Sequence, residues 1–78
     1  MPKLVIISGK KMIKLLNCCG FKIVRIKGSH HFLKNNESNL VTTVHVHGNE
    51  TLGVSLIKDI LSDINMTVEK YEKLRRKV

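Results

Sequence analysis

Residues 21–34 read FKIVRIKGSHHFLK, and this stretch predicts a β-hairpin. Its first half, Phe21 to Lys27, is rich in Phe, Ile and Val and contains neither glycine nor proline, which is typical of a strand. Gly28 and Ser29 then supply a tight turn. His30 to Lys34 gives the second strand. We therefore expect two antiparallel strands with a histidine directly after the turn that joins them.

A third strand is expected at residues 40–47, which are dense in β-branched side chains. It follows the polar loop 35–39, and both connections are too short for a crossover, so the three strands should form an antiparallel meander. Alternation along this strand places Val44 and Val46 on one face, which helices should cover. The opposite face carries polar side chains, namely Thr43, His45 and His47.

An apolar stripe at helical spacing predicts a helix at residues 9–19. Ser8 stands where a hydroxyl can cap the first turn, and Gly20 stands where a left-handed residue can end the helix. The stripe consists of Met12, Ile13, Leu15, Leu16 and Cys19.

A second apolar stripe predicts a helix after the loop 48–53, and Thr67 can cap a short last helix that would be marginal alone. The stripe consists of Leu56, Ile57, Ile60, Leu61 and Ile64. The order α-β-β-β-α with a C-terminal helical extension predicts an α+β fold in which two helices pack on one face of the sheet. We expect one domain over residues 1–78. Its core should include Leu15, Leu16, Val44, Val46, Ile57, Ile60 and Leu61.

The charge of the chain restricts the classes of partner. Fourteen Lys and Arg residues against six Asp and Glu residues give a formal net charge of +8. A small domain with this excess attracts polyanions. We favour nucleic acid over a membrane surface, because the basic residues do not form one face of a single amphipathic helix. An acidic protein partner is a further interpretation, compatible with the first.

Two features predict a cytoplasmic protein. The longest apolar run near the N-terminus, Leu4 to Ile7, is far too short for a signal peptide or a membrane span. Cys18 and Cys19 are adjacent, and a disulfide between neighbours would need strained geometry. Reduced thiols fit the cytoplasm.

Four histidines within residues 30–47 raise the question of a metal site. His45 and His47 share one face of a predicted strand, but His30 and His31 point to opposite faces of theirs. The ligand spacings of known zinc motifs are absent. We therefore expect no metal ion and no cofactor, and His45 and His47 can be explained as exposed strand residues.

The stretch Arg25-Ile26-Lys27-Gly28-Ser29-His30-His31 is the best candidate for chemistry. Cleavage of RNA without a metal needs a group that takes the 2′-hydroxyl proton, cations that stabilise the phosphorane, and an acid that protonates the leaving oxygen. A histidine at an exposed turn, close in sequence to an arginine and a lysine, meets part of this need. A purely structural β-turn is the alternative interpretation.

The sequence resembles the HicA-type toxins of bacterial and archaeal toxin–antitoxin pairs over essentially its whole length. The resemblance lies in Ser8-Gly9-Lys10, Cys19-Gly20-Phe21, Arg25-x-x-Gly28-Ser29-His30-His31, Val44-x-x-His47-Gly48 and Leu52-Gly53-Val54-x-Leu56-x-x-x-Ile60-Leu61. It implies a double-stranded-RNA-binding-domain-like fold, cleavage of mRNA with inhibition of translation, and neutralisation by a HicB-type antitoxin.

The resemblance also assigns roles to residues. His30 matches the catalytic histidine, and His47 matches a second histidine that is common in the family. We expect Arg25, Lys27, Gly28 and Ser29 to contact the RNA. The chain departs from the family at three positions, where a frequent proline, glycine and polar residue are replaced by His45, Ser55 and Ile26.

Two other functions fit the same sequence. A non-catalytic RNA-binding module would have the same fold and charge. It would recognise the RNA backbone or shape rather than stacked bases, because the only aromatic residues are Phe21, Phe32 and Tyr71. A protein-interaction module that binds an acidic partner is the third hypothesis.

Overall fold

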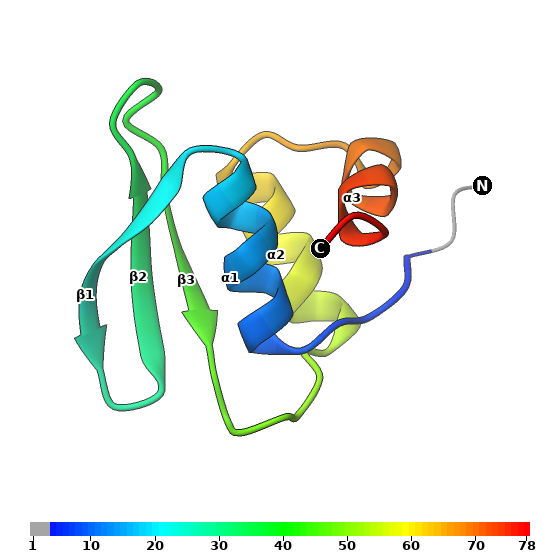
Figure 1. Ribbon diagram of the computed structural model, residues 1–78, viewed down its shortest axis with the longest axis horizontal. Helices are drawn as coiled ribbons and strands as arrows, with labels where there is room; N and C mark the ends of the chain where they lie inside the picture. The colour runs from blue at the N-terminus through cyan, green and yellow to red at the C-terminus, as the bar shows by residue number, and fades with distance from the viewer. Residues whose placement is uncertain (1–3) are drawn as a thin grey trace.

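The computed structural model describes residues 4–78 (Figure 1). The elements α1, β1, β2, β3, α2 and α3 span Gly9–Cys18, Phe21–Lys27, His30–Asn35, Val41–His45, Val54–Asp63 and Val68–Arg75. The strands form an antiparallel sheet in the order β1-β2-β3. Helices α1 and α2 cover one face of this sheet, and α3 packs against α1 on the far side. The predicted α+β fold and the antiparallel meander are confirmed.

The core lies between the sheet and the helices. In β3, Thr42 and Val44 point into it, while Thr43 and His45 point to the open face, so the predicted register is confirmed. In β2 the core position belongs to Leu33, which is fully buried. The buried apolar side chains are Ile7, Met12, Leu15, Leu16, Phe21, Leu33, Val44, Leu52, Ile57, Ile60, Leu61, Ile64 and Tyr71.

The predicted third strand was too long at both ends. It begins at Val41 and ends at His45, and Val46 is only partly buried. His45 pairs with His30, the first residue of β2, so the neighbouring strand offers no partner beyond this point. The backbone N–H of Val46 donates instead to the carbonyl of Ser29 in the hairpin turn, at 2.8 Å. Gly48, with φ of 57°, then turns the chain away from the sheet.

The helix ends follow the predicted signals. The Ser8 hydroxyl accepts a hydrogen bond from the backbone N–H of Lys11 at 3.1 Å, which satisfies one free donor of α1. Gly20 adopts φ of 91°, which a residue with a side chain would adopt only with strain. The helix ends at Cys18, one residue earlier than predicted, and Cys19 is its C-cap.

Helix α3 is too short to be stable in isolation, and packing against the rest of the chain supports it. Its Tyr71 side chain is fully buried, and the hydroxyl donates a hydrogen bond to the carbonyl of Val5. Burial raises the pKa of Tyr71 to about 12, so the hydroxyl keeps its proton for this bond. Glu72 accepts from the backbone N–H of Val5 at 3.1 Å. The last helix is thus tied to the segment that precedes α1.

No helix within residues 4–78 is both long enough and apolar enough to cross a membrane.

Candidate active site

The hairpin turn places His30 at the start of β2. Gly28 adopts φ of 59° at the first central position of this two-residue turn, where a type II′ turn needs a glycine. A Cβ atom at Gly28 would meet no atom within 4 Å, so the turn is open to solvent. Lys27 and His30 pair directly across the two strands. Their side chains therefore leave the sheet on the same face.

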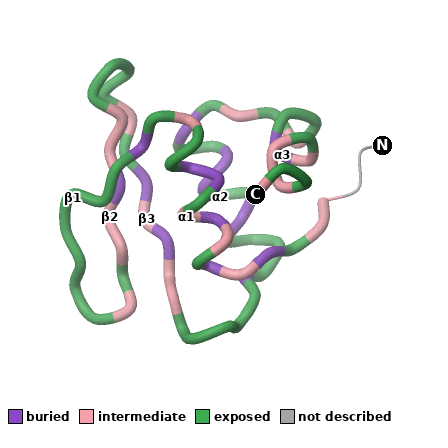
Figure 2. The backbone as a smooth tube through the Cα atoms, viewed as in Figure 1, coloured by how far each residue is buried: buried purple, intermediate pink, exposed green. Residues whose placement is uncertain are grey.

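A β-bulge in β1 determines which of its side chains face solvent. Ile23 pairs with Leu33 on the helix-covered face, whereas Arg25 pairs with Phe32 on the open face. Simple alternation would put residues 23 and 25 on one face, so the irregularity between them is what turns Arg25 outward. Beyond Phe21, all of β1 is exposed (Figure 2). Arg25 and Lys27 thus reach the open face beside His30.

Two cross-strand rows on the open face define the site. Lys27, His30 and His45 form the first row, and Arg25, Phe32 and Thr43 form the second. The ring centroids of His30 and His45 lie 4.3 Å apart, with an interplanar angle of 66°. From the sequence we explained His45 as an exposed strand residue and did not predict its contact with His30. No sequence motif indicates this contact.

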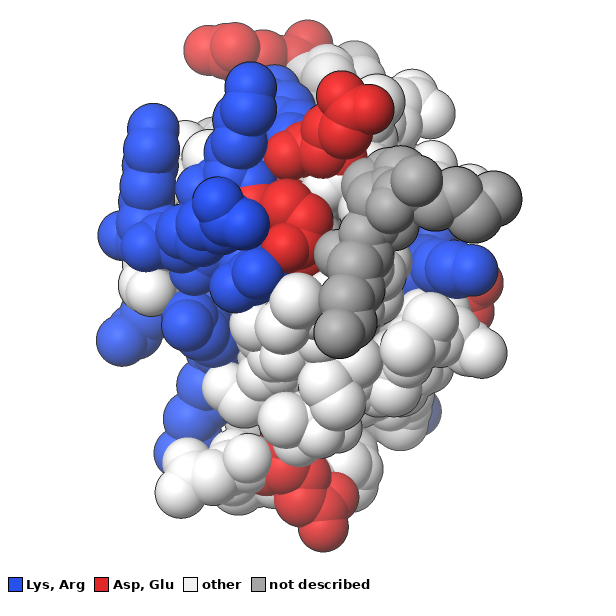
Figure 3. Space-filling view, turned by 90° about the vertical axis from the view of Figure 1, so that its right-hand side faces the viewer, with Lys and Arg blue, Asp and Glu red and all other residues white. Residues whose placement is uncertain are grey.

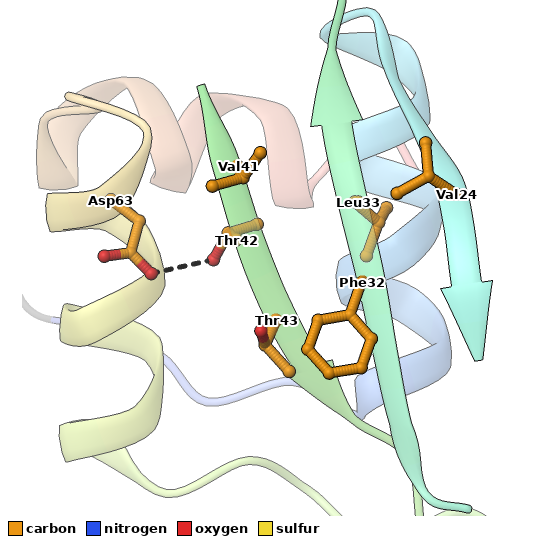
Figure 4. Close-up of a pocket in the computed structure, with 7 residues that line it drawn as sticks. All are labelled: Val24, Phe32, Leu33, Val41, Thr42, Thr43 and Asp63. Carbon is orange, nitrogen blue, oxygen red and sulfur yellow. Dashed lines mark hydrogen bonds between the residues drawn. The ribbon is translucent and has the colours of Figure 1, made fainter. Parts of the chain in front are cut away.

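A hollow at the sheet is lined by residues of β1, β2, β3 and α2 (Figure 4). Phe32 and Thr43, the row next to the histidines, form one part of its wall. The guanidinium of Arg25 lies 6.0 Å from the centroid of the Phe32 ring, within range of a cation–π interaction. Thr42 and Asp63 also line the hollow, and the hydroxyl of the buried Thr42 donates to Asp63 at 3.1 Å and so links β3 to α2.

The other two histidines lie outside the pair. His31 is on the covered face, opposite Val44, and its Nδ1 is 3.3 Å from the carbonyl oxygen of Ser29. His47 lies beyond the end of β3, exposed, just before Gly48. Within residues 4–78 the structure contains no cluster of three His, Cys, Asp or Glu side chains that could hold a metal ion.

Positive charge also gathers away from the sheet. In the view of Figure 3, Lys and Arg side chains crowd one side of the molecule. Helices α1 and α3 lie side by side, and α1 contains no acidic residue. The exposed basic residues of this helical surface are Lys10, Lys14, Lys70, Lys73, Arg76 and Lys77. Glu72 offsets part of this charge, through an ion pair with Arg75 at 2.6 Å.

Gly9, the first residue of α1, lies against the strand that carries His45. A Cβ atom at Gly9 would overlap the carbonyl oxygen of His45 and would lie 3.2 Å from the Cα of Val46. Only a glycine allows the start of α1 to approach this backbone so closely. The position of His45 therefore depends on the packing of α1 as well as on the sheet.

We expect Gly9→Ala to destabilise the protein by about 1–3 kcal/mol, because the new methyl group must displace backbone atoms. Helix propensity alone would give the opposite sign, with a gain of about 0.5–1 kcal/mol. Urea denaturation measures the difference. Asn17→Ala, on the exposed side of the same helix, is the control and should change the free energy of unfolding by less than about 0.5 kcal/mol. A stabilised Gly9→Ala variant would show that this contact does not constrain the fold.

Comparison with known families identifies the chain. The model of the family described as the HicA toxin of bacterial toxin–antitoxin systems matches residues 9–66. The chain belongs to the HicA toxin family. It is therefore the toxin of a toxin–antitoxin pair, and an antitoxin is its implied partner. No curated protein sequence matches it.

The matched region of the HicA toxin contains every residue singled out above on the open face. It begins at Gly9, where α1 meets the end of β3, and it ends at Met66, before α3. Helix α3 and its hydrogen bonds to Val5 thus lie outside the part that defines the family. The basic surface formed by α1 and α3 is only partly contained in it.

Proposed function

We propose that this HicA toxin is an endoribonuclease that cleaves mRNA in the cytoplasm without a metal ion and thereby inhibits translation. One observation carries the proposal. His30, the histidine of the Gly-Ser-His motif, is exposed on the open face of the sheet, and Lys27 is its direct cross-strand partner. Arg25 extends from the next row on the same face. An acid–base group and two cations thus lie together on an accessible surface.

The chemistry suits this arrangement because RNA contains its own nucleophile. Removal of the 2′-hydroxyl proton allows that oxygen to attack the adjacent phosphorus, and the bond to the 5′-oxygen breaks. Histidine is the side chain that gives and takes protons near neutral pH. The ammonium of Lys27 and the guanidinium of Arg25 would stabilise the extra negative charge on the phosphorane. We assign His30 as the catalytic residue on this basis.

The substrate strand would lie along the open face. Lys22 and Lys34 pair with each other at the far end of the β1–β2 ladder, so basic side chains flank both ends of this face. Phe32 lies between these ends and offers a partly exposed ring to a neighbouring base. Contacts to Gly28 and Ser29 would come from the backbone of the turn. The site supports binding through the phosphate backbone with limited help from stacking.

The partner would be an acidic antitoxin of the HicB type. The family membership of the chain implies an antitoxin, and the charge of +8 favours an acidic one. Such a protein would compete with RNA for the same cations.

The proposed activity predicts the chemistry of the cut ends. Purified toxin should cleave single-stranded RNA in the presence of excess EDTA and leave a 2′,3′-cyclic phosphate and a 5′-hydroxyl, because the 2′-oxygen is the nucleophile. End-labelled RNA, treated with a phosphatase and a kinase, reports both termini. An RNA with a 2′-deoxy nucleotide at the cleaved position is the control and should resist cleavage.

Three results would contradict the proposal. Loss of cleavage in EDTA, restored by a divalent cation, would indicate a metal-dependent mechanism. A 5′-phosphate product would indicate attack by water. Tight binding of RNA without any cleavage would favour the non-catalytic RNA-binding module.

A further inference from the structure

We propose that His45 is the second acid–base group of the site and acts together with His30 on the same phosphodiester. This inference rests on the proposed ribonuclease function and extends it to a residue outside the Gly-Ser-His motif. Its basis is the cross-strand pairing of the two residues, with ring centroids 4.3 Å apart on the open face.

Transesterification needs two proton transfers at two different oxygens. One group accepts the proton of the 2′-hydroxyl, and another donates a proton to the leaving 5′-oxygen. Lys27, the other cross-strand neighbour of His30, has an ammonium with three donors and no acceptor, so it can stabilise charge but cannot act as the base. His45 is the neighbour of His30 in the ladder that can serve either transfer.

The backbone position of His45 is well defined. The residue is half-buried, whereas His30 is exposed. The backbone next to it is held in two places, because the Val46 N–H donates to Ser29 at 2.8 Å and Gly9 packs against the His45 carbonyl. The first of these contacts ties the end of β3 to the turn that carries His30. The backbone therefore holds the strand positions from which the two imidazoles extend, which favours a preorganised catalytic pair.

The proposed step balances as follows. A neutral imidazole takes the 2′-hydroxyl proton while the 2′-oxygen forms a bond to phosphorus. The bond between phosphorus and the 5′-oxygen breaks, and this oxygen keeps the electron pair. The second ring, as imidazolium, donates a proton to it. The products are a 2′,3′-cyclic phosphate and a 5′-hydroxyl, and the two histidines have exchanged one proton in net terms. Solvent restores the starting protonation states.

A positioning role is the alternative, in which His45 only orients the ring of His30. The two roles differ in how they respond to the leaving group. A substrate with sulfur in place of the bridging 5′-oxygen leaves as a thiolate and needs no acid. Loss of the acid is then harmless, whereas loss of the base, or of correct positioning, is not.

The experiment compares His45→Gln, His30→Gln and the wild type on RNA with an oxygen or a sulfur at the bridging 5′ position. On the oxygen substrate each variant should lose about 10²–10⁴-fold in kcat. On the sulfur substrate one of the two variants should recover to within about tenfold of the wild type, which identifies the acid, and the other should stay slow. His31→Gln, the same substitution at the next residue of β2, whose side chain lies on the covered face opposite Val44, is the control and should cleave both substrates at nearly the wild-type rate.

Several outcomes overturn the inference. His45→Gln with wild-type cleavage of the oxygen substrate removes His45 from the reaction and leaves the proposed function intact. If both variants are slow on the oxygen substrate and neither recovers on the sulfur substrate, His45 has a positioning role. If both recover, the assignment of one histidine as acid and the other as base is wrong. A wild-type protein that cleaves neither substrate would refute the ribonuclease function itself. Circular dichroism of both variants checks that the fold is retained.

Discussion

Replacement of His30 by alanine should abolish both the cleavage of RNA and the inhibition of growth. The loss of cleavage should be at least about 10²–10⁴-fold, the usual contribution of one positioned acid–base group. His30 is exposed, and its ring contacts the ring of His45. The fold should therefore survive, with a change in the free energy of unfolding below about 0.5 kcal/mol.

Induction of each variant in cells, followed by growth and bulk mRNA, measures the toxic effect, and purified protein on a labelled RNA measures cleavage. His31→Gln is the matched control, because it replaces the next histidine of the same strand, whose side chain lies on the covered face opposite Val44. It should remain toxic. If His30→Ala cuts RNA at the wild-type rate, His30 is not the catalytic residue.

Most of the fold could be predicted because it depends on local signals. Ser8 and Gly20 mark the two ends of α1 by a cap and by a positive φ. Alternation in β3 identified Val44 as a core residue and His45 as a residue of the open face. These features depend on neighbours in sequence, which is why reading along the chain recovers them.

The residue that lies beside His30 could not be predicted in the same way. The partner of His30 depends on the register between β2 and β3, and this is determined by the loop between them. Asn39 in that loop adopts φ of 60°, and the backbone N–H of Asn35 donates to the carbonyl of Leu40 at 2.9 Å and closes the loop. A shift of one residue would turn His45 to the covered face. No local pattern specifies this geometry.

The orientation of Arg25 and the contact made by Gly9 also could not be predicted from the sequence. The outward position of Arg25 depends on a β-bulge after Ile23. A bulge adds one unpaired residue to the strand, and the alternation of apolar and polar residues in a sequence does not reveal it. The role of Gly9 as a contact for the His45 backbone joins segments that are far apart in the chain. The resemblance marked His45 only as a departure from the family's pattern, whereas the structure pairs its ring with that of His30.

The double charge reversal Arg25→Glu with Lys27→Glu should remove RNA cleavage and most of the affinity for the antitoxin together. Both residues are exposed on the open face, beside His30. The phosphates of RNA and the carboxylates of an acidic antitoxin are attracted by the same cations. In the variant, glutamates would face these anions, and such like-charge contacts cost several kcal/mol of binding free energy. We expect the antitoxin to bind at least about 10²-fold more weakly, since each tenfold corresponds to about 1.4 kcal/mol.

The matched control is Lys58→Glu with Lys73→Glu, which makes the same change in net charge at exposed positions of α2 and α3. If net charge alone drove association, both pairs would weaken binding equally. If the antitoxin instead covers the open face around His30, the control should retain cleavage and most of its affinity for the antitoxin. The wild-type complex should also weaken as salt rises, because exposed charges are screened over about 10 Å at 0.1 M ionic strength.

The same variants separate occlusion from inhibition at a distance. An antitoxin that crosses the Gly28-Ser29 turn would cover His30 without any conformational change, because the turn is open and the histidine follows it directly. An antitoxin that bound the basic surface of α1 and α3 would leave His30 accessible, and the control pair, which includes Lys73 of that surface, would then be the one to lose affinity. Full-strength binding by the Arg25→Glu, Lys27→Glu variant, measured by calorimetry, would place the antitoxin elsewhere and refute a surface shared with RNA.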